Sequence, residues 1–189
     1  MWGFFIKFVK RQTMYSFQND YQFINNTPIV EPVTVAEAKQ YCRVNNDVED
    51  DLFAELITQS REAIEMATNL SLIPRQVDVW FNNEAGNFPL PFGPVTYFMS
   101  LYNAQNNLIP QSQYLVIGGP NPKVAAPMWA NMKASYMAGY DCLPKELKIA
   151  MLDQINYGYE NRGMDVNDMG ICEKTWRVCQ RWTKTSPIL

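Results

Sequence analysis

The spacing of apolar residues changes along this chain, and that change limits the fold more than any other feature. In residues 52–67, apolar or small side chains recur at intervals of three and four, which is typical of one face of a helix. From residue 74 to 140 the interval becomes two, and β-branched and aromatic residues are frequent. Helical spacing returns after Pro144. We therefore predict an α+β fold, a small helical bundle with an inserted antiparallel β region and a C-terminal helix.

Local signals place the ends of the helices. Thr34-Val-Ala-Glu37 is a capping box and predicts a helix over 35–42. Asn45-Asn-Asp47 predicts a turn and a cap for the next helix, which should end near Thr68 with Asn69 in the left-handed conformation. Pro144 suits the first position of a third helix. Gly158 inside that helix indicates close packing or a tolerated flaw.

Several short antiparallel strands are expected between the turns of the middle segment, as a small sheet or a curled barrel. The predicted strands lie within 76–81, 95–102, 114–117 and 132–137. Gly118-Gly-Pro120 resembles a phosphate loop only in its glycines, because it lacks the Gly-Lys-Ser/Thr ending and a following helix. We interpret it as a turn.

Composition excludes many enzyme designs. The 189 residues contain no histidine, and the four cysteines form no CxxC pair, so we expect reduced structural thiols. The acidic run 47–51 suits either a magnesium site or, more simply, the positive end of a helix dipole. An enzyme that uses paired acids would need a strongly shifted carboxylate pKa, which the sequence does not show. We predict no catalytic, metal or cofactor site, and no enzymatic activity.

The N-terminal residues are apolar but do not suit a membrane. Residues 2–9 contain one charge, are too short to cross a bilayer, and are followed by Lys10 and Arg11, which is the wrong order for a signal peptide. We expect synthesis in the host cytoplasm and no membrane partner. The aromatic residues of this segment are candidates for an arm that docks on a neighbouring subunit: Trp2, Phe4, Phe5 and Phe8.

The order of several motifs resembles the head-tail connector, or adaptor, family of tailed bacteriophages. The matching segments are Glu31 to Lys39, Arg43 to Asp51 leading into the helix that contains Arg61 to Glu65, Phe88 to Pro91 with Pro94-Val95, Ala138 to Tyr140, and Leu143-Pro144 to Tyr159-Glu-Asn-Arg162. The chain departs from the family pattern at Asn69 and at Gly158. The resemblance extends from residue 31 to 162.

This resemblance implies a structural virion protein of the phage neck that binds the portal protein. Family members assemble, usually as twelve copies, into a ring that prolongs the DNA channel towards the next neck or tail protein. The implied organisation is an N-terminal arm over 1–30, a connector domain over 31–163, and a C-terminal helix and tail over 164–189. Duplex DNA would pass through the lumen without specific binding, in keeping with a net charge of −3.

The last helix, expected from Ile171 to Lys184 with Trp176, Cys179 and Trp182 near one face, is the candidate portal-facing element. Trp and Arg are the residue types most frequent at binding hot spots. The candidate contacts to the portal or an adjacent ring are Trp176, Arg177, Arg181 and Trp182. Alternatively, both Trp side chains pack their helix on its own domain.

The sequence also allows an alternative function, the binding of single-stranded nucleic acid. A small module that binds single-stranded nucleic acid would stack bases on an aromatic β surface. It would need a basic groove beside the aromatic residues, and the strand over 132–140 offers only Lys133.

Overall fold

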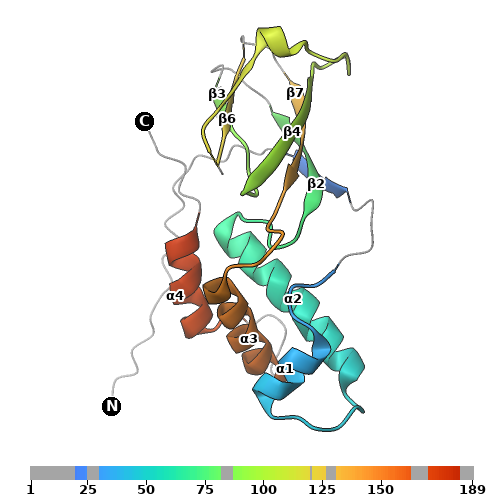
Figure 1. Ribbon diagram of the computed structural model, residues 1–189, viewed down its shortest axis with the longest axis vertical. Coiled ribbons are helices and arrows are strands. Elements are labelled where there is room, and N and C mark those ends of the chain that lie inside the picture. Colours follow the sequence, from blue (N-terminus) through green and yellow to red (C-terminus); the bar gives the residue numbers. More distant parts are fainter. Residues whose placement is uncertain are drawn as a thin grey trace, which may run out of the picture.

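The computed structural model describes residues 20–24, 30–81, 87–119, 121–126, 131–162 and 170–183. They form a helical body and a β region, which lie at opposite ends of an elongated molecule (Figure 1). The helical body contains α1 (Val35–Cys42), α2 (Asp50–Thr68), α3 (Lys145–Glu160) and α4 (Glu173–Trp182). The β region contains β1 (Asp20–Ile24), β2 (Arg75–Phe81), β3 (Asn87–Pro89), β4 (Val95–Tyr102), the 3-10 helix η1 (Gln111–Gln113), β5 (Leu115–Ile117), β6 (Lys123–Ala125) and β7 (Met132–Ala138). The predicted α+β fold with an inserted β region is confirmed.

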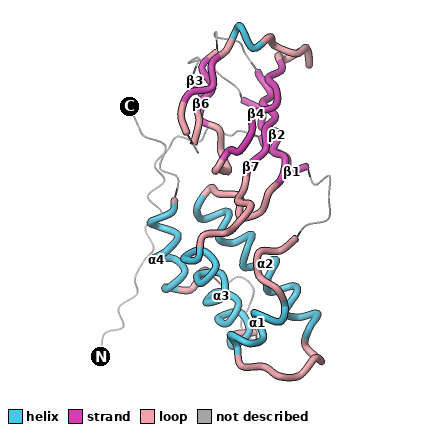
Figure 2. The backbone as a smooth tube through the Cα atoms, viewed as in Figure 1, coloured by secondary structure: helices cyan, strands magenta, loops and turns pink. Residues whose placement is uncertain are grey.

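The strands form two antiparallel sheets (Figure 2). One sheet has the order β1-β2-β7-β4, and the other has the order β3-β6-β5. Val77 lies opposite Phe23 on one side and Tyr136 on the other, which sets the register of the larger sheet. The four predicted strands are present as β2, β4, β5 and β7, whereas β1, β3 and β6 were not predicted.

Each part has its own hydrophobic core, because each buries a different set of apolar side chains. The core of the β region includes Val77, Val79, Leu90, Leu101, Val124, Ala134 and Tyr136. The core of the helical body includes Phe53, Ile57, Ile64, Leu147, Met151, Ile155 and Cys179. The four cysteines Cys42, Cys142, Cys172 and Cys179 are free thiols, as expected.

The helix ends follow the predicted signals with two exceptions. Thr34 and Glu37 form the capping box of α1, and α2 ends at Asn69 with φ of 54°. The cap predicted from Asn45 to Asp47 is wrong, since α2 begins at Asp50 and the preceding Glu49 makes no side-chain cap hydrogen bond. Pro144 also lies one position before the first residue of α3, where it serves as the N-cap residue.

Two glycines allow close packing between elements. Gly139 follows β7 with φ of +120°, and a Cβ atom there would lie 2.0 Å from the carbonyl oxygen of Ile73. This position joins the β region to the helical body, so it requires glycine. At Gly158 a Cβ atom would lie 2.9 Å from Cδ2 of Leu56, which explains this glycine by the close approach of α3 to α2.

A buried cluster of charged side chains connects α2 to β2. Nε of Arg61 lies 2.9 Å from Oε2 of Glu31, and its Nη1 lies 2.9 Å from Oε2 of Glu65. Nη2 of Arg75 lies 2.8 Å from the same Oε2 atom of Glu65. This contact is an ion pair without a hydrogen bond. Burial lowers the pKa of Arg75. Glu65 and Glu31 together therefore offset the charges of two buried guanidinium groups where the two parts of the molecule meet.

Candidate interaction surfaces

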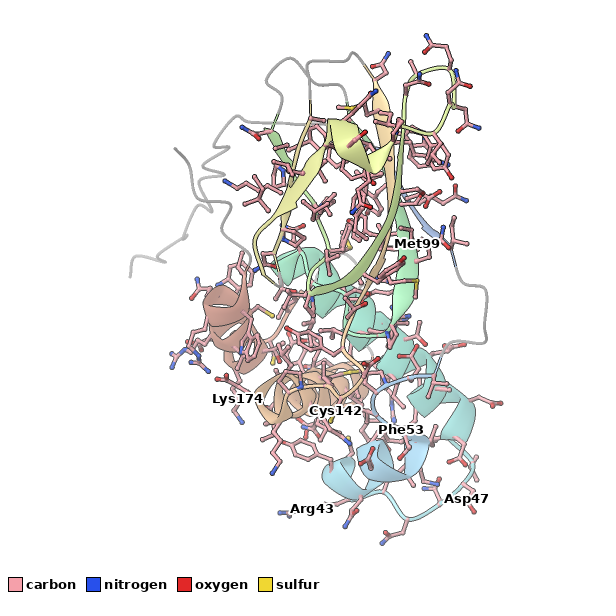
Figure 3. All side chains as sticks on the ribbon, turned by 45° about the horizontal axis from the view of Figure 1, so that its top comes forward. Arg43, Asp47, Phe53, Met99, Cys142 and Lys174 are labelled. Carbon is pink, nitrogen blue, oxygen red and sulfur yellow. The ribbon has the colours of Figure 1, made fainter. Side chains whose placement is uncertain are left out.

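Helix α4 is held on α3 by a polar and an apolar anchor. Oγ1 of Thr175 donates a hydrogen bond of 2.8 Å to the carbonyl oxygen of Ala150, and both Thr175 and Cys179 are fully buried. Burial raises the pKa of the Cys179 thiol to about 11, so the thiol is neutral. The opposite side of α4 faces outward, where Figure 3 shows Lys174 pointing away from the body. This outward side is the surface that α4 offers to another molecule.

The four candidate interface residues of α4 fall into two pairs. Arg181 and Trp182 both bind Glu146 of α3, and Nε1 of Trp182 donates to Oε2 of Glu146 over 2.8 Å. Hydrogen bonds from Trp182 and then Arg181 lower the pKa of Glu146. Arg177 pairs at 2.5 Å with a glutamate one turn earlier on α4, and Trp176 is 45% exposed. The two Trp side chains differ in burial: Trp182 packs on the core of its own domain, whereas Trp176 is exposed at the surface.

The candidate arm residues Trp2, Phe4, Phe5 and Phe8 lie outside the described residues. The described structure begins at Asp20, within the segment predicted as the N-terminal arm. Residues 20–24 pair with β2 as an edge strand, with Asp20 opposite Trp80. Trp80 is near the end of β2 that is farther from the helices. The chain therefore enters the described structure at the outer end of the β region.

The acidic run before α2 forms ion pairs within the helical body. Nζ of Lys39 lies 2.6 Å from Oδ1 of Asp47 and 2.7 Å from Oδ1 of Asp50. Glu49 accepts hydrogen bonds from Tyr159 over 2.7 Å and from Arg162 over 3.0 Å. Figure 3 shows Asp47 on the loop at the lower end of the body. Among the described residues, no three His, Cys, Asp or Glu side chains come together as a candidate metal site.

The outer face of the larger sheet carries aromatic side chains around one lysine. Nζ of Lys133 lies 4.7 Å from the ring centroid of Tyr102 and 6.0 Å from that of Trp80. The same ammonium group is 3.5 Å from Oδ2 of Asp78, which offsets its charge. In the four strands of this sheet, Lys133 is the only base on the outer face. The basic groove required by the nucleic-acid alternative is not formed there.

Strand β5 carries an apolar surface that the sequence did not reveal. Its three residues, Leu115, Val116 and Ile117, are all exposed. Consecutive apolar residues in a short strand usually indicate burial on both faces. No charged residue lies between Tyr114 and Gly119, so no signal in the sequence distinguishes this exposed strand from a buried one.

One hollow of the described structure, of about 420 Å³, includes the ionisable side chains of Glu31, Asp141, Cys142 and Lys148 in its lining. Another, of about 460 Å³, lies between α2 and α3 and is lined mainly by small or apolar side chains, without an ionisable pair. Its lining includes Leu56, Ala63, Met66, Ala67, Gly158 and Ile171. In the described part of the chain, no helix has both the length and the apolar character needed to cross a membrane.

The motifs that carry the family resemblance are structural. Tyr159 stacks on Phe53, with ring centroids 4.9 Å apart, while Tyr159 and Arg162 bind Glu49 at the start of α2. The hydroxyl of Tyr136 donates to the carbonyl oxygen of Pro91 over 2.6 Å. These contacts fix the ends of helices and loops inside one subunit.

Comparison with protein families gives a match over residues 32–170 to the family described as "Phage gp6-like head-tail connector protein". The chain belongs to this family. A structure described as the neck of an empty gene transfer agent particle, computed with C6 symmetry, is similar with a TM-score of 0.72 and 19% identity. The neck of the native particle, computed with C12 symmetry, is similar with a TM-score of 0.69 and 18% identity. Each comparison covers 89% of this connector and 97% of the other chain. No curated protein sequence is significantly similar.

Proposed function

We propose that this connector is a structural, non-enzymatic component of the phage neck, which forms a twelvefold ring between the portal protein and the next neck or tail protein. The family match over residues 32–170 carries this proposal. The likeness of the fold to chains in neck structures with C6 and C12 symmetry supports it. Before assembly, the chain resides in the host cytoplasm.

The exposed apolar side chains support assembly with other subunits. A closed ring joins two different surfaces of each subunit, and the centres of such interfaces are enriched in aromatic and aliphatic side chains. The described structure exposes such side chains on several elements, including Trp80, Tyr97, Leu115, Ile117 and Trp176. Contacts with other subunits and with the portal would remove these side chains from water.

The outward side of α4 is the proposed portal contact. Trp176 and Arg177 are free to contact another chain, because neither is needed to hold α4 on α3. Arg181 and Trp182 orient the helix through Glu146. The aromatic arm residues Trp2, Phe4, Phe5 and Phe8 are proposed to dock on a neighbouring copy. In this proposal, residues 1–30 act as the arm, 31–163 as the connector domain, and 164–189 as the portal-facing helix and tail.

Imaging of purified particles, or of the protein mixed with its portal, tests this function. The expected result is a twelvefold ring of this chain at the neck, with α4 against the portal. The variant Trp176→Ala should weaken portal binding, and the exposed Met66→Ala serves as a control on α2. Particles whose neck lacks this chain would contradict the proposed function.

A further inference from the structure

Among the described strands, the β region has four edge strands, and three of them carry features that oppose pairing with another chain. β3 is three residues long and contains Pro89, whose nitrogen has no hydrogen to donate. β4 has two register irregularities against β7. β1 begins with the charged residue Asp20. These are the usual means by which proteins keep the edges of sheets from associating.

Strand β5 is as short as β3, but it contains no proline, no register irregularity and no charged residue. Among the described strands it pairs only with β6, so its other edge is open. Leu115 is 67% exposed and Ile117 is 55% exposed. The run from Tyr114 to Gly119 contains no charge and no proline. An open edge with exposed apolar side chains is a template on which another strand can form.

The N-terminal segment has the sequence of a suitable strand. Residues 2–9, WGFFIKFV, have large apolar side chains at every second position and carry a single charge, at Lys7. Aromatic and β-branched residues favour extended backbone. Residues 10–19 connect this segment to β1 and can span at most about 35 Å when extended. The segment can therefore reach well beyond the β region of its own copy.

The positions of β1 and β5 fit a contact between neighbouring copies. β1 lies on one side of the β region, and β6, the partner of β5, lies on the other side (Figure 2). An arm that leaves β1 of one copy and binds β5 of the next joins two different surfaces. Repetition of such a contact around an axis closes a ring.

We infer that residues 2–9 of one copy add as a strand to the open edge of β5 in the neighbouring copy. Backbone hydrogen bonds along the edge hold the arm, and Trp2, Phe4, Ile6 and Phe8 form one face that covers exposed side chains of β5. This inference rests on the proposed ring and names the surface that receives its arm. It also explains why β5 lacks the proline, the irregular register and the charge of the other edges.

Photo-crosslinking of the full-length protein tests the inference. Benzoylphenylalanine replaces Val116, isotopically labelled and unlabelled copies are mixed under conditions of ring assembly with the portal, and linked peptides are identified by mass spectrometry. The expected result is links from position 116 to residues 2–9 that join a labelled to an unlabelled chain. Links only within one chain, or links that never reach residues 2–9, overturn the inference. Imaging of the same sample separates the two proposals, because rings without these links overturn only the arm contact, whereas a lack of rings counts against the proposed function.

A matched pair of variants tests the role of the edge itself. Ile117→Lys places a charge on β5, and Leu108→Lys places one at an equally exposed apolar residue outside β5. Ile117→Lys should lower the yield of links between copies by about tenfold, because a lysine on an edge strand opposes pairing. Leu108→Lys should leave the yield unchanged. Thermal unfolding checks that both variants fold, and equal yields from the two variants overturn the inference.

Discussion

In the helical body, many charged side chains form ion pairs, such as Lys39 with Asp47 and Arg162 with Glu49, and the α-helices bury their apolar faces against one another. In the β region, the only described ion pair between two of its own residues joins Lys133 to Asp78. The β region also exposes many large apolar side chains: Tyr21, Trp80, Tyr97, Met99, Leu108, Leu115, Val116 and Ile117. The helical body also exposes apolar side chains in or beside its helices, at Val30, Tyr41, Val48, Met66, Ile149 and Trp176, so the two parts differ most in their ion pairs. The β region has fewer of these pairs and carries eight of the fourteen exposed large apolar side chains of the described residues. This contrast suggests that ring contacts are concentrated in the β region and portal contacts at α4.

The largest expected effect is at Gly139, where the two parts are joined. Gly139→Ala should destabilise the protein by about 4 kcal/mol or more, because the new Cβ atom would meet the Ile73 carbonyl oxygen and φ is positive. The matched control is Gly119→Ala, where a Cβ atom meets nothing within 4 Å. Urea unfolding measures both variants. Equal stability of the two would show that the junction is not constrained as described.

The next effect concerns the buried charges between α2 and β2. Glu65→Gln should lower the free energy of unfolding by about 3 kcal/mol, because Arg61 and Arg75 lose their shared carboxylate. Glu62→Gln is the control, since Glu62 is exposed and lies 3.5 Å from Arg61, and its effect should stay below about 1 kcal/mol. A small effect for Glu65→Gln in chemical denaturation would mean that the two parts are not coupled through this cluster.

The third prediction is that the two Trp residues of α4 have different roles, Trp182 in the stability of the subunit and Trp176 in assembly. Trp182→Ala should cost about 2 kcal/mol, because this half-buried side chain packs on the core and bonds Glu146. Trp176→Ala should change stability by less than about 0.5 kcal/mol, as expected for a surface position. Thermal unfolding gives both values. A large loss of stability for Trp176→Ala would mean that this side chain stabilises the subunit itself, and it would weaken the proposed role of Trp176 at the portal.

The smallest effect is a pH dependence of the helical body. A hydrogen bond from Lys148 lowers the pKa of Glu37 below its usual value of 4.5, so the associated stability is present above pH 4.5 and is lost as the pH falls through the folded pKa. Glu37→Gln keeps a capping-box residue but removes this charge. The variant should therefore show a smaller loss of stability between about pH 6 and about pH 3 than the unchanged protein. Urea unfolding at the two pH values measures it, with the exposed Glu55→Gln as control; identical losses in all three proteins would contradict the assignment.

The helical body could be predicted well because its signals are local. Thr34 and Glu37 lie one helical turn apart, and Asn69 ends α2 through its own backbone conformation. The N-terminal cap of α2 was predicted wrongly because Asp47 pairs with Lys39, which lies on another helix. Gly158 could be flagged from the sequence, but only the structure shows that Leu56 is the side chain it accommodates.

The β region could be predicted only in part because strand pairing depends on distant residues. β3 and β6 are three residues long, and β1 is a five-residue strand that pairs with β2 more than 50 residues later. The exposure of β5 could not be predicted, because its apolar run is typical of a buried strand. Trp176 and Trp182 are each three residues from Cys179, so spacing alone did not show which of them is buried.

Radical footprinting of the free subunit and of assembled necks tests the central claim most directly. This measurement reports the solvent exposure of individual side chains, including Tyr97, Leu115, Ile117 and Trp176. The account predicts that labelling of these side chains falls on assembly, while labelling of the buried cores stays low in both states. Unchanged labelling of the β region and of Trp176 in assembled necks would contradict it.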